Sequence, residues 1–248
     1  AGGTCVLNPE PIADFFDFFV IGDGEEVMLE LLQVVRESKE QKTTREKLLR
    51  QVAKLDGIYV PSLYKVVYYP DGRLRSFTPT VPEAKPVIQR RIVKKLPPPV
   101  TKPIVSYIET IHDRGAIEIQ RGCTRGCRFC QAGIIYRPMR VRPRDEIEKT
   151  VEEILNNCGY DEVSLVSLSS GDYPDVDQLV GNLTRHFENL SLSLPSLHIN
   201  SFSLELMEAL SPRKKIGLTF APEAGTDRMR RVINKQLTEQ EILDTFAE

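Results

Sequence analysis

Residues 121–130 read RGCTRGCRFC, which places Cys123, Cys127 and Cys130 in a C-x3-C-x2-C spacing directly after an apolar stretch at residues 116–120. Three thiolates in one short loop can bind three irons of a cubane cluster, and the two glycines of the loop let the backbone fold around the inorganic sulfides. One iron is then left without a protein ligand. Clusters that only carry electrons usually have four cysteine ligands, so the spacing predicts a cluster with one open coordination position.

The same cysteines leave a second kind of site open. A structural zinc site needs a fourth ligand, for which Cys158 or His112 is available. An open coordination position would suit a catalytic cluster. The alternative is a non-catalytic metal-binding module, either stabilised by zinc or acting as an iron-sulfur electron carrier. The spacing favours the cluster over zinc.

Cysteine usage and charge limit the class of protein. Three of the five cysteines crowd into one loop, which is a poor disulfide framework and fits a reducing compartment, so we expect a cytoplasmic protein. The 33 lysines and arginines nearly balance the 35 acidic residues, so the overall charge neither requires nor excludes a nucleic-acid partner. Apolar stretches fall far short of the roughly 20 residues of a membrane helix, and we expect no membrane partner.

From residue 116 onward the hydrophobic pattern switches repeatedly between a period of two and a period of 3.6 residues. The first period indicates a strand and the second a helix, and their alternation predicts an α/β fold with a parallel sheet. The predicted strands are residues 116–120, 162–168, 197–202 and 216–220, and the predicted helices include residues 145–157 and 176–187.

Ligands of parallel α/β sheets bind at the carboxyl ends of the strands. The polar segments that follow the predicted strands are residues 120–123, 169–172, 200–203 and 221–225. We therefore expect the cysteine loop and three polar turns to share one edge of the sheet.

Other polar residues near this edge are less specific. The arginines that follow the cysteine loop predict a local positive patch suited to a phosphate or carboxylate substrate, with a solvated basic loop as the alternative. His186, and His198 in the third predicted strand, are expected to be structural. The four arginines are Arg137, Arg140, Arg142 and Arg144.

The cysteine spacing, the aromatic residue before the last cysteine and the place of the loop after the first strand resemble the radical S-adenosylmethionine superfamily. The resemblance covers residues 116–248. It implies a partial parallel βα (TIM-like) barrel and an enzyme that uses a 4Fe-4S cluster to cleave S-adenosylmethionine reductively to a 5′-deoxyadenosyl radical. It also implies a one-electron reductant of the flavodoxin or ferredoxin type. The substrate, whether RNA, protein or a small molecule, stays open.

The resemblance implies roles for residues beside the cysteines. Phe129 would lie next to the adenine of S-adenosylmethionine. The turn Ser170-Gly171-Asp172 takes the place of the family's Gly-Gly-Glu, which binds the methionine amino group, although aspartate has a shorter reach than glutamate. Ser201 and Glu223 would contact the methionine carboxylate and the ribose. The alternatives are a Ser201 hydroxyl bonded to nearby backbone and a Glu223 that favours a helix N-terminus.

The N-terminal part carries a second resemblance. Its segments Gly2-Gly3, NPEP at 8–11 and FVIGDGEE at 19–26 are similar to the closing strand and turn of a cobalamin-binding domain. The whole chain resembles an uncharacterised bacterial family that combines this domain with a radical S-adenosylmethionine core. The resemblance implies cobalamin as a cofactor of the full-length protein and a cobalamin-assisted methyl or methylthio transfer as its reaction.

These patterns divide the chain into three expected regions. Residues 1–55 are the C-terminal part of a cobalamin-binding-like α/β domain, residues 56–103 a β-hairpin and proline-rich linker, and residues 104–248 the radical S-adenosylmethionine core, truncated at its C-terminal side. The hairpin turns at Asp71-Gly72, because this pair supplies the positive φ angles of a tight turn. The chain starts without methionine and stops inside a helix predicted by the capping pair Thr238 and Glu241, so we expect a fragment.

Overall fold

The computed structural model describes residues 1–248 except residues 109–110, 112, 202, 211–218 and 248. The chain forms two compact units, Ala1–Lys95 and Leu96–Glu248, and each has its own hydrophobic core. None of the helices in the described parts of the chain combines the length and the apolar character that a membrane span requires.

The N-terminal unit contains two helices, a two-stranded antiparallel sheet and a hairpin. The second helix starts at Thr44, whose Oγ1 accepts a hydrogen bond from the backbone N–H of Lys47 at 3.3 Å. Buried Phe19, Val27 and Ile58 join the sheet to the helices. The elements are η1 (Thr4–Leu7), η2 (Glu10–Phe15), β1 (Phe19–Val20), α1 (Val27–Glu40), α2 (Arg45–Val52), β2 (Ile58–Tyr59), η3 (Pro61–Leu63), β3 (Tyr64–Tyr68) and β4 (Leu74–Pro79).

The glycine-acid turn of this unit binds the segment at residues 90–93. Gly22 has a φ of 111°, and a Cβ there would lie 2.2 Å from the carbonyl oxygen of Arg91, so a larger residue does not fit. The buried carboxylate of Asp23 accepts a hydrogen bond from the backbone N–H of Val93 at 2.9 Å. These contacts attach part of the proline-rich segment to the N-terminal unit.

The predicted hairpin is confirmed. β3 and β4 pair antiparallel from Tyr64 opposite Pro79 to Tyr68 opposite Leu74, and Gly72 in the turn has a φ of 82°. The positive φ is the reason that a glycine follows Asp71 in this turn.

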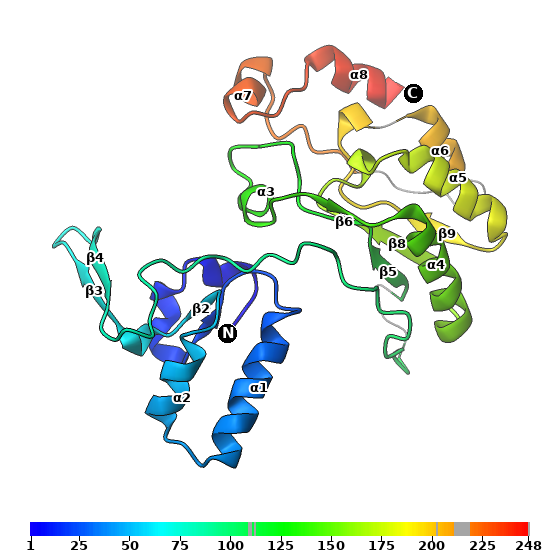
Figure 1. The fold of residues 1–248 in the computed structure, drawn as a ribbon. Helices are drawn as coiled ribbons and strands as arrows, with labels where there is room; N and C mark the ends of the chain where they lie inside the picture. Colours follow the sequence, from blue (N-terminus) through cyan, green and yellow to red (C-terminus); the bar gives the residue numbers. More distant parts are fainter. Residues whose placement is uncertain (109–110, 112, 202, 211–218, 248) are drawn as a thin grey trace. The chain divides into compact units, whose positions relative to one another are not determined.

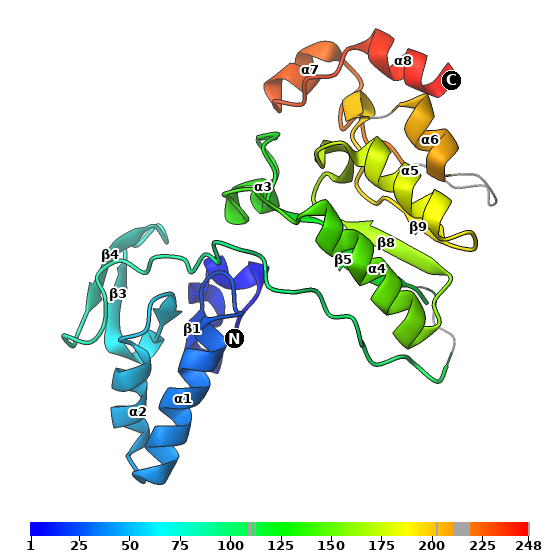
Figure 2. The ribbon, with the colours of Figure 1, turned by 45° about the vertical axis from the view of Figure 1, so that its right-hand side comes forward.

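The C-terminal unit is built on a three-stranded parallel sheet in the order β5-β8-β9, with α4 and α5 packed on it (Figures 1 and 2). Helix α4 buries Ile147, Val151 and Ile154 and ends where Gly159 takes a left-handed φ of 70°. The elements of the C-terminal unit are β5 (Gly115–Glu118), β6 (Gln120–Arg121), α3 (Gln131–Ile135), β7 (Arg140–Val141), α4 (Arg144–Cys158), β8 (Glu162–Val166), η4 (Ser170–Asp172), α5 (Val176–His186), β9 (Ser191–Ser193), η5 (Ile199–Ser201), α6 (Leu204–Leu210), α7 (Asp227–Val232) and α8 (Glu239–Ala247).

Two predicted strands and the predicted helices of this unit match the structure, and the capping pair is formed. Thr238 Oγ1 accepts a hydrogen bond from the backbone N–H of Glu241 at 3.2 Å, and the Glu241 carboxylate accepts one from the backbone N–H of Thr238 at 2.7 Å. The parallel sheet is confirmed, and its closure into a partial barrel remains a prediction.

The prediction of a third strand at residues 197–202 is wrong. The third strand is Ser191–Ser193, and Ile199–Ser201 is a 3-10 helix. The carbonyl oxygen of His198 accepts hydrogen bonds from the backbone N–H and the hydroxyl of Ser201, so these residues turn instead of extending. Most of the fourth predicted strand, residues 216–220, lies outside the described residues.

Candidate functional site

The cysteine loop follows β6, which pairs antiparallel with β7 in a separate two-stranded sheet, and ends in α3. A Cβ at Gly122, whose φ is 94°, would lie 2.6 Å from the carbonyl oxygen of Tyr136, so only glycine allows this exit. Cys130 caps α3, and its Sγ accepts a hydrogen bond from the backbone N–H of Gly133 at 3.2 Å. Cys123 Sγ accepts another from the backbone N–H of Arg125 at 3.4 Å. Backbone donors therefore point at two of the three sulfurs.

The donor set fits a thiolate-bound cluster. Cys123, Cys127 and Cys130 are unbridged and partly exposed. Burial raises the pKa of the Cys127 thiol, Lys235 opposes this, and the other two thiols of the loop raise it further, so the three sulfurs interact electrostatically. Amide N–H groups directed at sulfur are a known means by which proteins stabilise such clusters.

The described residues form no site for a single metal ion. Among the described residues, no group of three His, Cys, Asp or Glu side chains is placed to hold one metal ion. A cubane differs from zinc here, because each cysteine binds its own iron and the sulfurs need not converge on one point. Cys158 lies in the last turn of α4, near the start of β5, whereas the cysteine loop follows the end of that strand. The second proposed zinc ligand, His112, lies outside the described residues.

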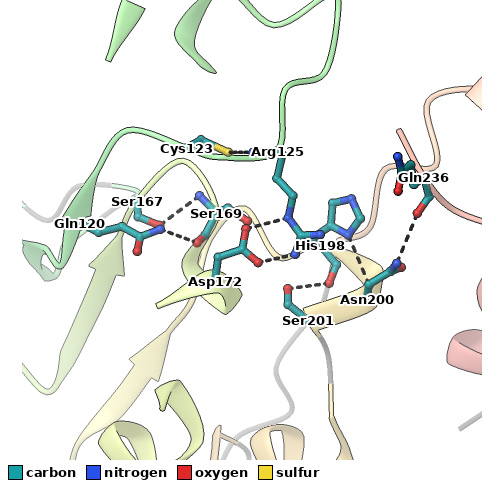
Figure 3. Close-up of polar contacts among 10 residues, drawn as sticks. All are labelled: Gln120, Cys123, Arg125, Ser167, Ser169, Asp172, His198, Asn200, Ser201 and Gln236. Carbon is teal, nitrogen blue, oxygen red and sulfur yellow. Dashed lines mark hydrogen bonds and ion pairs between the residues drawn. The ribbon is translucent and has the colours of Figure 1, made fainter. Parts of the chain in front are cut away.

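Asp172, at the end of η4, is bound by Arg125 from the cysteine loop (Figure 3). Arg125 Nε donates to Asp172 Oδ2 at 2.7 Å, and Nη2 donates to Oδ1. Burial by itself raises the pKa of Asp172, but the hydrogen bonds from Arg125 and Ser169 and the nearby positive charge hold that pKa below its usual value. Asp172 is thus an ionised carboxylate beside the cysteine loop.

The other two residues of this turn have structural contacts. Ser170 is fully buried, and its hydroxyl lies 2.6 Å from the carbonyl oxygen of Pro195 and 3.2 Å from that of Leu165. A Cβ at Gly171 would lie 2.3 Å from Ser201 Oγ, so the glycine allows η4 and η5 to approach closely. The structure brings Gly171, Asp172 and Ser201 together, and Ser170 points into the protein.

The remaining predicted residues lie around the loop. The Ser201 hydroxyl donates to the carbonyl oxygen of His198 at 2.9 Å. Glu223 has a left-handed φ of 68°, and its carboxylate lies 3.1 Å from Lys235 Nζ. Phe129 is 55% exposed, so its ring is open to contact.

A polar cavity of about 440 Å³ lies beside the cysteine loop and is lined in part by Arg125, Cys127 and Asp172. Burial, with the cations Arg125 and Lys235, lowers the pKa of His198 to about 4, so its imidazole is neutral at pH 7. Sequence reasoning missed this arrangement and expected His198 to be structural. The lining residues are Thr124, Arg125, Cys127, Asp172, His198, Asn200, Asn234, Lys235 and Gln236.

A second, more apolar cavity of about 370 Å³ lies at the exit of the loop. It is lined in part by Gln120, Tyr136 and Leu168. Gln120 is 1% exposed, and its Nε2 donates to the carbonyl oxygen of Ser169 at 3.0 Å. Its Oε1 has no hydrogen-bond partner in the described part of the chain. A buried acceptor without a partner is unfavourable.

The predicted basic patch is not formed as expected. Arg140 and Arg142 are only 7% and 2% exposed. Arg140 Nε donates to the carbonyl oxygen of Pro138 at 3.1 Å, and Arg142 Nε donates to that of Glu118 at 2.9 Å. Both side chains are thus engaged inside the protein, Arg140 with a carbonyl group of the segment before β7 and Arg142 with one at the end of β5.

A segment more than 100 residues away in sequence holds the cysteine loop. The backbone N–H of Arg128 donates to the carbonyl oxygen of Ile233 at 2.9 Å, and Asn234 Nδ2 donates to the carbonyl oxygen of Gly126 at 2.8 Å. No local pattern in the sequence predicts these contacts.

Two family models match parts of the chain. Residues 117–248 match the family model described as "Radical SAM superfamily", and residues 1–61 match "Radical SAM proteins, N-terminal". Uncharacterized protein MJ0966 of Methanocaldococcus jannaschii is 31% identical over 255 residues, which cover 99% of this chain and 47% of that protein. The chain thus spans about half the length of this curated relative.

Two solved proteins share the fold. One is TsrM from Kitasatospora setae, a radical S-adenosylmethionine methyltransferase solved with cobalamin and a 4Fe-4S cluster, with a TM-score of 0.58 and 16% identity over 98% of this chain and 46% of that chain. The other is OxsB, a cobalamin-dependent S-adenosylmethionine radical enzyme, with a TM-score of 0.58 and 12% identity over 98% of this chain and 33% of that chain. Because the superfamily model matches more than half of the chain, this protein belongs to the radical S-adenosylmethionine superfamily.

Proposed function

We propose that the protein is a radical S-adenosylmethionine enzyme that holds a 4Fe-4S cluster on Cys123, Cys127 and Cys130. The observation that carries this proposal is the cysteine loop itself, with backbone donors on two sulfurs and an ionised Asp172 next to it. When bound and reduced by one electron, such a cluster with an open iron supplies the electron that splits S-adenosylmethionine into methionine and a 5′-deoxyadenosyl radical.

The protein's own residues bind and orient S-adenosylmethionine. Asp172 is a carboxylate placed to accept hydrogen bonds from the methionine ammonium group, and Arg125 holds it in place through two bonds. Neutral His198 adds no charge to the cavity; its Nδ1 accepts a hydrogen bond from the backbone N–H of Asn200 at 3.3 Å, which leaves Nε2–H to donate. We assign the adenine contact to Phe129, whose ring is exposed.

Two further contacts each require an existing interaction to change. We assign the methionine carboxylate to Ser201, whose hydroxyl would have to leave the carbonyl oxygen of His198. We assign the ribose to Glu223, whose carboxylate would have to share its contact with Lys235. Gly171 supports both assignments indirectly, because it lets Ser201 approach the turn, and Ser170 acts by fixing that turn.

The substrate would bind in the more apolar cavity at the loop exit. Its walls include Tyr136 and Leu168, and the buried Gln120 Oε1, which has no partner among the described residues, would have to turn toward the cavity to accept a hydrogen bond from the substrate. A substrate with an N–H or O–H group beside an apolar body fits this chemistry. RNA, a protein side chain and a small metabolite can all present such a group.

The reaction outcome proposed is a cobalamin-assisted methyl or methylthio transfer by the full-length protein. The support is the fold shared with TsrM and OxsB over nearly the whole chain, including the N-terminal unit. We further propose a cytoplasmic location and reduction by a flavodoxin-type or ferredoxin-type donor.

Cluster content tests the proposal directly. Anaerobically reconstituted full-length protein should contain about four iron and four sulfide per chain. Cys127→Ala should lose the visible absorbance of the cluster. Cys158→Ala and Cys5→Ala should keep it, because the proposed ligands are the three cysteines of the loop. Full iron content in Cys127→Ala, or a colourless zinc protein, would contradict the assignment.

A further inference from the structure

Lys235 is a buried cation beside the cysteine loop. Its residue is only 9% exposed, and its ammonium lies 3.1 Å from Glu223 Oε1. It lines the same cavity as Cys127. Buried lysines are uncommon because desolvation penalises their charge, so the position calls for a physical reason.

The fold fixes Lys235 through Arg230. The Arg230 side chain is buried, its Nε donates to the carbonyl oxygen of Leu237 at 2.8 Å, and its Nη1 donates to that of Ala224 at 2.7 Å. The backbone N–H of Lys235 donates to the carbonyl oxygen of Arg230 at 2.8 Å. One guanidinium therefore ties both ends of residues 224–237, which holds the backbone at Lys235 in place.

The same segment holds the cysteine loop. Asn234, next to Lys235, binds the carbonyl oxygen of Gly126, and the Arg128 backbone binds Ile233. Glu223 and Asn234 are both non-glycine residues with left-handed φ angles, 68° and 57°. Such angles are uncommon outside glycine and persist where surrounding contacts enforce them. The ion pair and the cysteine loop are thus parts of one rigid arrangement.

We propose that Lys235 is a positioning residue that sets the reduction potential of the cluster, with Glu223 as its counter-charge. The inference rests on the proposed function. A 4Fe-4S cluster gains one negative charge on reduction, so a nearby buried cation favours the reduced form and a nearby carboxylate opposes it. The electron comes from an external one-electron donor, which is oxidised. No bond forms or breaks.

Redox titration of two charge-removing variants tests the inference. Full-length Lys235→Gln and Glu223→Gln are reconstituted anaerobically and titrated with titanium(III) citrate, and the reduced cluster is followed by its EPR signal without S-adenosylmethionine. Lys235→Gln should lower the midpoint potential and Glu223→Gln should raise it. Each shift should change the ratio of oxidised to reduced cluster on the order of tenfold, which is ~59 mV for one electron.

Two controls separate charge from structure. Lys235→Arg keeps the charge and should retain most of the wild-type potential. Lys149→Gln removes a lysine whose side chain is 75% exposed on α4 and should leave the potential unchanged. If the substitutions only loosened the cysteine loop, Lys235→Gln and Glu223→Gln would shift the midpoint potential in the same direction. Shifts of opposite sign are therefore specific to an electrostatic role.

The outcomes distinguish this inference from the proposed function. Absence of a cluster in the wild-type protein would contradict the proposed function itself. A reducible wild-type cluster, with no shift or with shifts of the same sign in the two variants, would overturn the role of Lys235 alone. If Lys235→Gln takes up no iron, Glu223→Gln decides: a raised potential supports the inference, and an unchanged or lowered one overturns it.

Discussion

Arg125 binds Asp172 through two hydrogen bonds, although 47 residues separate them in sequence. The pair joins the cysteine loop to the turn that follows the second strand of the sheet, and its side chains are 30% and 18% exposed. A guanidinium that binds both oxygens of a carboxylate fixes its direction as well as its charge, which a lysine ammonium does not do. The orientation of Asp172 is therefore a property of the loop that carries the cysteines.

Removal of either partner should weaken S-adenosylmethionine binding while the cluster stays. We expect Asp172→Asn to raise the Kd for S-adenosylmethionine on the order of tenfold, about 1.4 kcal/mol, because the ammonium group loses its ionic partner. Arg125→Lys should weaken binding less than Asp172→Asn. Anaerobic calorimetry with reconstituted full-length protein measures both, and Arg144→Gln is the control, since Arg144 contacts Gln178 and the Asp175 carbonyl instead. Wild-type affinity in Asp172→Asn would rule out the ammonium contact.

Gly171→Ala should destabilise the protein. The added Cβ would lie 2.3 Å from Ser201 Oγ and 2.8 Å from Ser201 Cβ, so η4 and η5 must move apart at a cost of about 1–3 kcal/mol. Urea unfolding measures the change. Gly181→Ala in α5 is the matched control, because a Cβ there meets nothing within 4 Å. The double variant Gly171→Ala, Ser201→Gly should recover part of the loss, and equal stability of the two alanine variants would contradict the close approach.

His198 should make the cluster-free protein less stable in acid. Its pKa is lowered to about 4 by burial and nearby cations, whereas in the unfolded chain it is about 6.5. Below pH 6.5 the unfolded state binds a proton that the folded state resists, so stability is present above this pH and falls as the pH decreases to about 4. The midpoint of urea unfolding at pH 7.5 and pH 4.5, determined on cluster-free protein with its cysteines kept as thiols, measures this loss. His198→Asn should show a smaller decrease, and an identical decrease would exclude His198 as its source.

The sequence predicts the elements whose signals are local. The hairpin at Asp71-Gly72, the capping pair Thr238 and Glu241, and helix α4 all follow from neighbouring residues, and the structure contains each of them. The cysteine loop is of the same kind, because its spacing is itself the signal. The short strand Ser191–Ser193 gives no such signal, since a single leucine between two serines shows no periodicity.

The rest of the candidate site depends on contacts between distant residues. Asn234 bonds to the cysteine loop, and Lys235 lines the same cavity as Cys127, although both lie more than 100 residues further along the chain. No spacing in the sequence predicts this. Arg140 and Arg142 look like a surface patch in the sequence, but they are buried and donate hydrogen bonds to the carbonyl groups of Pro138 and Glu118. Their direction, inward or outward, is decided by the tertiary fold.

Reductive cleavage of S-adenosylmethionine is the measurement that tests the central claim most directly. Full-length protein with a reconstituted cluster is incubated without oxygen with S-adenosylmethionine and titanium(III) citrate, and the products are quantified by chromatography and mass spectrometry. We predict that methionine and 5′-deoxyadenosine form slowly and in equal amounts without substrate. Asp172→Ala should form smaller amounts of both products, and Cys130→Ala should form neither. A protein with a complete and reducible cluster that binds S-adenosylmethionine and forms no 5′-deoxyadenosine would contradict the account.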